Sequence, residues 1–160
     1  MGDRGLKSLI ICTSIHHENT LKIGMVIAEV IGAEIVRPLD IDPSQAAAYD
    51  LLGFGSGVYY GNLHSSIREF VERLPQSRGK RVFIFSTSGL PKIPLLHDYH
   101  RSVRETLRMK GYEVVGEFTC RGLSDHGPLK WLGGVNKGRP NEYDLRDARK
   151  FAEKLLHSLR

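Results

Sequence analysis

Cysteine and long hydrophobic runs are both scarce in this sequence of 160 residues. Its two cysteines, Cys12 and Cys120, are too few for a disulfide framework, and zinc and iron–sulfur clusters need more ligands at fixed spacings. No apolar stretch approaches the roughly 18 residues that a membrane-spanning helix needs. The N-terminal residues also lack the apolar core of a signal peptide. We therefore expect a cytoplasmic protein in which each cysteine is a small buried hydrophobic residue at the end of a strand.

Positive charge is in excess, with a formal net charge of +5 and a pI of about 9.3. The basic residues are spread along the chain and are not interleaved with aromatic residues in one run, so nucleic-acid binding is not indicated. Arg101, Arg104 and Arg108 are spaced to share one helix face. We expect that face to be solvated, and a docking surface for an acidic partner is the alternative.

Two kinds of apolar segment alternate along the chain. Short runs rich in Ile, Val, Leu and Phe predict buried strands, and apolar residues at spacings of three and four predict amphipathic helices. This alternation is typical of an α/β domain with a parallel sheet and right-handed crossovers. The predicted strands are 6–12, 33–36, 50–55, 81–85 and 112–119, and the predicted helices are 21–31, 65–74, 97–110 and 141–158.

The chain length and the number of strands favour a single domain over residues 1–160, built as a three-layer α/β sandwich. The five parallel strands are expected in the order 2-1-3-4-5, with helices on both faces of the sheet. In that order the winding direction reverses between strands one and three, and ligands bind outside the carboxyl ends of the strands at this point. The segments after strands one, three and four are therefore the candidate site.

The segment after the first strand leads directly into a predicted helix and is rich in polar groups. Unpaired backbone amides and the positive end of the helix dipole favour an anion at such a helix start. We interpret the segment as a phosphate pocket, and the alternative is an ordinary N-cap by Asn19 or Thr20. The candidate phosphate ligands are Thr13, Ser14, Ile15, His16, Asn19 and Thr20.

Glycines and tyrosines follow the third strand, and small hydroxyl residues follow the fourth. A glycine lets the backbone approach a ligand closely, and a tyrosine ring offers a flat face to a planar heteroaromatic group. Taken alone, the first of these segments also fits tyrosines that cap the sheet edge, and the second fits a polar turn. The candidates are Ser56, Gly57, Val58, Tyr59, Tyr60 and Gly61 after strand three, and Ser86, Thr87, Ser88 and Gly89 after strand four.

These three segments resemble the cofactor loops of the flavodoxin family, and the resemblance extends over nearly the whole chain. Residues 13–20 are similar to the family's hydroxyl-rich phosphate loop, which ends in Asn-Thr. Residues 55–61 and 86–89 stand where the family has its second and third flavin loops. The resemblance implies non-covalently bound FMN, with the phosphate at the first segment and the isoalloxazine ring between the other two.

The sequence departs from the family pattern in three respects. His16, His17 and Glu18 stand where the usual phosphate loop has a glycine, so we expect His16 to reach the cofactor and Glu18 to point away from it. The third segment lacks the acidic, tyrosine-containing stretch of small electron-carrier flavodoxins. Those carriers are also strongly acidic, whereas this chain is basic.

Other α/β classes need residues that this sequence lacks. A Rossmann dinucleotide fold needs G-x-G-x-x-G after the first strand, whereas the glycine-rich stretch 53–57 follows the third. A response regulator needs acidic residues at the ends of strands one and three, and a Ser/His/Asp hydrolase needs a G-x-S-x-G elbow. His64, His97 and His100 stand near no cluster of cysteines or acids, so no metal site is expected.

Three functions fit these expectations. The first is an electron-transfer flavoprotein in which no side chain acts as acid or base and a redox partner, possibly an acidic protein, docks near the ring. The second is an FMN-dependent NAD(P)H oxidoreductase that reduces a quinone or a similar acceptor. The third is a flavodoxin-like binding module without cofactor. The glycine-rich segment 121–140, with Trp131, Lys130, Lys137 and Arg139, is a candidate lid, docking loop or packing element.

Overall fold

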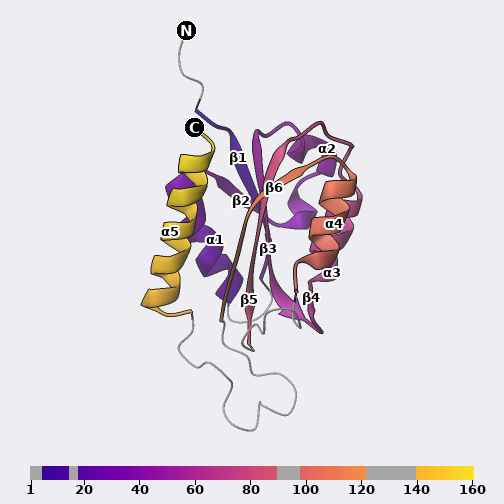
Figure 1. The fold of residues 1–160 in the computed structure, drawn as a ribbon. Coiled ribbons are helices and arrows are strands. Elements are labelled where there is room, and N and C mark those ends of the chain that lie inside the picture. The colour runs from indigo at the N-terminus through magenta and orange to yellow at the C-terminus, as the bar shows by residue number, and fades with distance from the viewer. Residues whose placement is uncertain (1–4, 15–17, 90–97, 122–139) are drawn as a thin grey trace.

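In the part of the chain that the computed structural model describes, residues 5–14, 18–89, 98–121 and 140–160, a parallel sheet lies between two layers of helices (Figure 1). The sheet also has a short antiparallel strand, β4 (Asn62–Leu63), beside β3. The predicted order 2-1-3-4-5 of the parallel strands is confirmed. Across the sheet these are β2 (Glu34–Val36), β1 (Ser8–Thr13), β3 (Leu51–Tyr59), β5 (Arg81–Ser88) and β6 (Glu113–Arg121).

Helices cover both faces of the sheet (Figure 1). One layer consists of α1 (Asn19–Ile31) and α5 (Glu142–Ser158), and the other contains α3 (Ser65–Glu72) and α4 (Arg101–Met109). The 3₁₀ helix η1 (Pro38–Asp40) and the single turn α2 (Pro43–Ala46) connect β2 to β3. Among the described helices, none is both long and apolar enough to cross a membrane.

Strand β1 divides its apolar side chains between two cores, because successive residues of a strand point to opposite faces. Leu9 and Ile11 pack in the core beneath α3 and α4, whereas Ile10 and Cys12 pack beneath α1 and α5. All four are buried. This two-sided burial explains why the strand is apolar at nearly every position.

The glycines of β3 make room for phenylalanine rings of β5. Gly53 pairs with Phe83 and Gly55 with Phe85 across the sheet. A Cβ atom on Gly53 would lie 2.2 Å from the Phe83 ring, and one on Gly55 would lie 2.1 Å from the Phe85 ring. At these two positions the lack of a side chain is therefore required for the packing of the core, rather than for contact with a ligand.

Strands β3 and β5 extend further than the sequence predicted. The predicted ends, residues 55 and 85, are wrong because the backbone pairing continues through Ser56↔Ser86 and Gly57↔Thr87. Strand β3 then turns back into β4 through Tyr60 and Gly61, whose φ angles are 50° and 78°. Two residues with positive φ between antiparallel strands form the tight turn that a two-residue hairpin favours. The expected loop after strand three is thus a β-hairpin.

The helix boundaries follow local sequence signals. Helix α1 ends at Gly32, which adopts the left-handed conformation with φ 68°. Helix α5 begins with an N-cap at Asn141, whose side chain and that of Asp144 bond reciprocally to each other's backbone N–H. Helix α4 begins at Arg101, later than predicted, and the predicted first residue His97 lies outside the described residues.

Candidate functional site

The carboxyl ends of four parallel strands are aligned at one edge of the sheet, at the bottom of Figure 1. Thr13 of β1 pairs with Ser56 of β3, Ser56 pairs with Ser86 of β5, and Ser86 pairs with Thr119 of β6. The structure therefore brings the described parts of the three predicted cofactor segments to the same edge, on both sides of the point where the winding reverses. Ile15 and His16 lie outside the described residues.

The N-cap residue of α1 does not cap the helix with its side chain. The N-cap residue is Glu18, which adopts a left-handed conformation with φ 51° and makes no side-chain capping bond. Asn19 and Thr20 are the first two residues of the helix, so the alternative interpretation of either as the N-cap is wrong. Both are buried. A helix start whose N-cap residue leaves the first amide groups uncapped favours an anionic ligand.

The hydroxyl groups of the first segment reach the neighbouring elements. Thr13 Oγ1 lies 2.7 Å from Ser66 Oγ in α3, and Thr20 Oγ1 lies 2.8 Å from Thr87 Oγ1 in β5. Ser14 Oγ is buried and has no hydrogen-bond partner among the described residues. These hydrogen bonds link the first segment to α3 and β5. The segment also retains one buried hydroxyl group to which a ligand can form a hydrogen bond.

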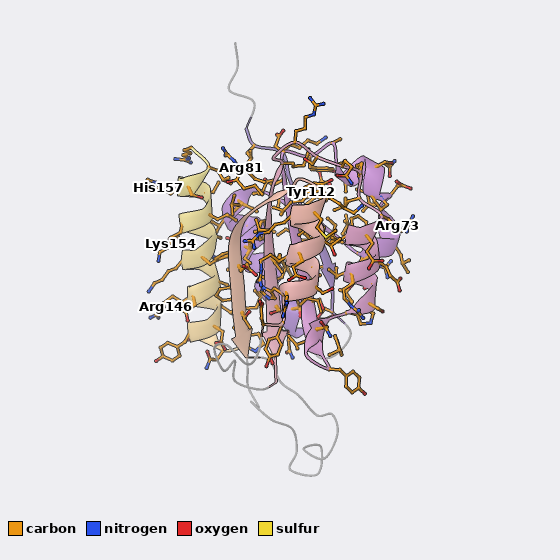
Figure 2. The ribbon with its side chains drawn as sticks, turned by 45° about the vertical axis from the view of Figure 1, so that its right-hand side comes forward. Arg73, Arg81, Tyr112, Arg146, Lys154 and His157 are labelled. Carbon is orange, nitrogen blue, oxygen red and sulfur yellow. The ribbon has the colours of Figure 1, made fainter. Side chains whose placement is uncertain are left out.

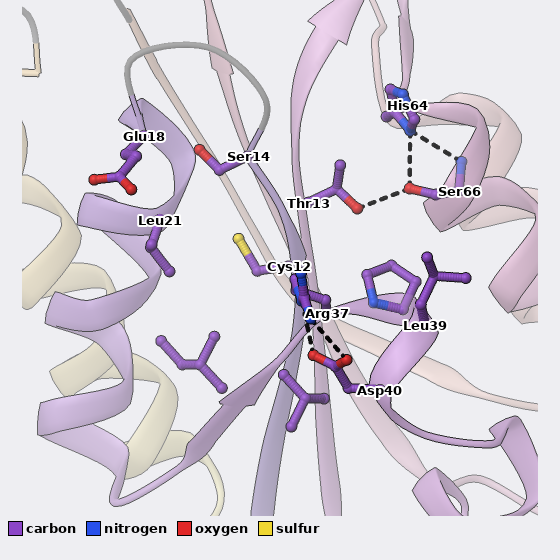
Figure 3. A pocket seen from close by; sticks show the side chains of 13 residues that line it. Cys12, Thr13, Ser14, Glu18, Leu21, Arg37, Leu39, Asp40, His64 and Ser66 are labelled. Carbon is purple, nitrogen blue, oxygen red and sulfur yellow. Dashed lines mark hydrogen bonds and ion pairs between the residues drawn. The ribbon is translucent and has the colours of Figure 1, made fainter.

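A cavity of about 520 Å³ opens beside this segment, on the side of β2 (Figure 3). Glu18 lines this cavity and is exposed, and its side chain lies beside the start of α1 (Figure 3). Cys12 also lines the cavity, and burial raises the pKa of its thiol to about 12. Cys12 is therefore a protonated, unreactive thiol, as expected of a buried structural cysteine. The remaining lining comes from Thr13, Ser14, Leu21, Ile35, Val36, Arg37, Pro38, Leu39, Asp40, His64 and Ser66.

His64 and Ser66 support the first two segments, although neither is among the cofactor-binding residues predicted from the sequence. Ser66 Oγ lies 2.8 Å from His64 Nδ1, and the Ser66 backbone N–H donates to the same nitrogen at 3.1 Å. The His64 backbone N–H donates to Ser56 Oγ at 2.8 Å. The run His64-Ser65-Ser66 before an amphipathic segment was the available signal, since it has the form of a helix start.

The two tyrosines of the hairpin differ in their surroundings. The Tyr59 ring packs edge-on against the His64 imidazole at 5.3 Å and is half-buried, and this burial raises the pKa of its phenol. Its hydroxyl group would lie 3.1 Å from a Cβ atom on Gly57, so the glycine allows the ring to fold back along the strand. Tyr60 is fully exposed at the turn. Val58 and Gly61 complete the hairpin.

The third segment is strand for most of its length. Ser86, Thr87 and Ser88 are the last residues of β5 and are buried, and Gly89 follows them. The side chain of Ser86 points to His100, with Oγ 2.7 Å from Nε2. Its hydroxyl group therefore faces the α4 layer, and the end of the strand at Ser88 and Gly89 is the part nearest to the predicted ring site.

The three arginines predicted on one solvated helix face, Arg101, Arg104 and Arg108, all belong to α4 but differ in exposure. Arg104 turns toward the sheet, where it forms ion pairs with Asp98 and Glu117 that raise its pKa. Arg101 is exposed and pairs with Glu105. The three arginines lie on one helix at the predicted spacing, but the face is not solvated throughout, because acids on neighbouring elements draw Arg104 inward.

The basic side chains of α5 lie elsewhere on the surface. Figure 2 shows Arg146, Lys154 and His157 along the outer face of this helix. Within the described ranges, no group of three or more His, Cys, Asp or Glu residues could hold a metal ion. The basic segment residues Lys130, Lys137 and Arg139 lie outside the described residues, as does Trp131.

The fold and the site together define a flavodoxin-like α/β domain with a helix N-terminus at the winding reversal. The flavodoxin domain family model matches residues 10–122. An uncharacterised protein of Methanocaldococcus jannaschii is 42% identical over 151 residues, which cover 94% of this chain and 99% of that protein. The chain therefore belongs to the flavodoxin family.

Solved structures show the same fold. Flavodoxin 2 from Bacillus cereus superposes with a TM-score of 0.71 at 18% identity, over 95% of this chain and 99% of that one. A flavodoxin from the domain Archaea superposes with a TM-score of 0.68 at 16% identity, over 96% of this chain and 98% of that one.

Proposed function

We propose that the protein binds FMN non-covalently and acts in electron transfer. The observation that carries this proposal is the start of α1, where the N-cap residue Glu18 makes no side-chain capping bond and Asn19 and Thr20 are buried. The buried hydroxyl group of Ser14, which has no partner in the described part of the chain, lies in the segment just before it. A phosphate group at this position would accept hydrogen bonds from the backbone amides and from Ser14, and the helix dipole would stabilise its charge.

The ring of the cofactor would lie between the β3–β4 hairpin and the end of β5. The hairpin supplies two tyrosines, of which Tyr59 is half-buried and Tyr60 exposed, and Ser88 and Gly89 supply backbone groups. When bound, FMN supplies the redox chemistry. The side chains of this chain bind and orient the cofactor, and none is assigned the role of an acid or a base.

The donor and acceptor of electrons are further parts of the proposal. With a net charge of +5, an acidic redox protein is the favoured partner, because long-range attraction speeds the encounter of opposite charges. Raising the ionic strength to about 0.15 M should then slow its electron transfer. The reducing cytoplasm, where free thiols persist, is the proposed compartment.

A cofactor assay tests this function directly. Purified protein, reconstituted with FMN if needed, should show flavin absorbance that bleaches with dithionite, and mass spectrometry of the heat-released cofactor should identify FMN. Rapid NADPH oxidation with a quinone acceptor would favour the oxidoreductase over a simple carrier. FAD as the only ligand would refute the FMN assignment, and a protein that takes up no flavin would be a cofactor-free binding module.

A further inference from the structure

A chain of hydrogen bonds runs from the end of β1 to the start of α3 (Figure 3). Thr13 Oγ1 lies 2.7 Å from Ser66 Oγ, which in turn lies 2.8 Å from His64 Nδ1. The Ser66 backbone N–H also donates to His64 Nδ1, at 3.1 Å. All three residues line the cavity beside the first segment. The direction of each hydrogen bond in this chain decides what Thr13 can offer to a ligand.

The direction is set at His64, the N-cap residue of α3. Its Nδ1 accepts the backbone N–H of Ser66, so this nitrogen carries no hydrogen, and the neutral imidazole has its hydrogen on Nε2. The positive end of the α3 dipole also disfavours a charged imidazole at this position. The Ser66 hydroxyl group must then donate to Nδ1, because lone pairs that face each other at 2.8 Å would repel.

The hydrogen of the Thr13 hydroxyl group is committed for the same reason. A hydroxyl group donates a single hydrogen and accepts through its lone pairs. Because Ser66 uses its hydrogen on His64, it can only accept from Thr13 across the 2.7 Å contact. Thr13 Oγ1 therefore keeps acceptor capacity for a ligand but has no hydrogen left to donate. A phosphate dianion needs donors, so it is a poor match for this oxygen.

Thr13 lies between the positions proposed for the two ends of the cofactor. It directly precedes Ser14, and it pairs with Ser56 of β3, the strand that continues into the β3–β4 hairpin. The same network contacts the hairpin, because the His64 imidazole packs against the Tyr59 ring with centroids 5.3 Å apart. In FMN the ribityl chain joins the phosphate to the ring, and its hydroxyl groups can donate hydrogen bonds. An acceptor at Thr13 fits this part of the cofactor.

We propose that Thr13 recognises the ribityl chain of the flavin by accepting a hydrogen bond from one of its hydroxyl groups, and that Ser66 and His64 are positioning residues that hold Thr13 in this role. This inference rests on the proposed function. It reassigns Thr13 from the phosphate, for which its place in the sequence makes it a candidate, to the ribityl chain. The start of α1 and the Ser14 hydroxyl group remain for the anion.

The test compares the affinities of FMN, of riboflavin, which lacks the phosphate, and of lumiflavin, which also lacks the ribityl chain. Thr13→Val removes the acceptor and keeps the shape of the side chain. Loss of one neutral hydrogen bond corresponds to roughly twofold to tenfold in affinity. FMN and riboflavin should therefore bind more weakly by the same factor in fluorescence titrations, and lumiflavin should bind as it does to the parent. Thr13→Ser retains the hydroxyl group and should follow the parent for all three flavins.

Ser66→Ala tests the positioning role. The acceptor on Thr13 remains but is no longer held, so FMN and riboflavin should lose equal affinity, less than in Thr13→Val, and lumiflavin should lose none. Ser65→Ala, at the exposed first residue of α3, is the matched control and should follow the parent. Nitrogen nuclear magnetic resonance of His64 in the parent holoprotein checks the direction of the chain without a variant. At about pH 8, where free imidazole is neutral, the ring hydrogen should be on Nε2.

Several results would overturn the inference while the proposed function stands. A greater loss for FMN than for riboflavin in Thr13→Val would show that Thr13 donates to the phosphate. An equal loss for lumiflavin would show that Thr13 acts on the fold, and unchanged affinities would show that it makes no contact with the cofactor. A hydrogen on His64 Nδ1 would reverse the direction of the chain. If the parent takes up no flavin after reconstitution, the proposed function fails, and this inference fails with it.

Discussion

Replacing Thr20 with valine would remove one hydroxyl group of a buried pair while keeping the shape of the side chain. The partner hydroxyl group, on Thr87, lies 2.8 Å away, and the two residues are 2% and 6% exposed. Thr20→Val therefore leaves the Thr87 hydroxyl group buried without this partner, which costs about 1–3 kcal/mol of unfolding free energy. Thr87→Val should have a similar cost. The double variant exchanges both groups for apolar ones and should lose less than the sum of the single losses.

The same variants separate stability from cofactor binding. If Thr87 donates to Thr20, the hydrogen of Thr20 remains available for the proposed phosphate group. A charge-assisted bond of about 1.5–3 kcal/mol corresponds to roughly tenfold to a hundredfold in affinity. The double variant should therefore bind FMN more weakly by this factor and riboflavin, which lacks the phosphate, as well as the parent does. Thr87→Val is the matched control, because it keeps the Thr20 hydroxyl group.

Urea unfolding and fluorescence titration with both flavins are the measurements. Strictly additive losses of unfolding free energy would show that the two hydroxyl groups do not interact, which would contradict the hydrogen bond in the structure. An equal loss of affinity for FMN and riboflavin would show that Thr20 acts on the fold alone. Only this second result would remove Thr20 from the phosphate site.

Three further changes test other parts of the structure. Alanine at Tyr59 or at Tyr60 should restore flavin fluorescence for whichever ring stacks on FMN, and no change in either variant would place the ring elsewhere. Gly55→Ala should lower the unfolding free energy by about 1–3 kcal/mol through overpacking against a buried phenylalanine ring, whereas Gly5→Ala, in open space, should not. Because the folded state lowers the pKa of Glu117, its stabilising effect is present above about pH 4.5 and is lost as the pH falls through the folded value. Urea unfolding below pH 4.5 should show a smaller acid-induced loss for Glu117→Gln than for the parent.

The sequence predicted the parallel sheet well because its strands are apolar on both faces. This pattern is typical of a parallel sheet that helices cover on both sides. The sequence did not predict where β3 and β5 end, because Ser56 and Ser86 interrupt the apolar pattern and the strands continue beyond them. Both serines are fully buried, and their hydroxyl groups bond to His64 N and to His100. Partners that are distant in the sequence make a polar residue compatible with a buried strand, and no local pattern reveals them.

The face of the sheet on which Glu117 lies could not be predicted, because the pairing of β5 and β6 is irregular. Strict alternation along β6 would put Val114 and Phe118 on one face and Glu117 on the other. The register shifts between Val82 and Phe83 of β5, which pair with Val114 and Gly116, so β6 contains one extra residue. The shift reverses the alternation beyond that point, placing Phe118 in the core beneath α1 and α5 and Glu117 against His100. A single irregularity in strand pairing thus sets which side chains of β6 reach the α4 layer, and the contacts of Glu117 with His100 and Arg104 depend on it.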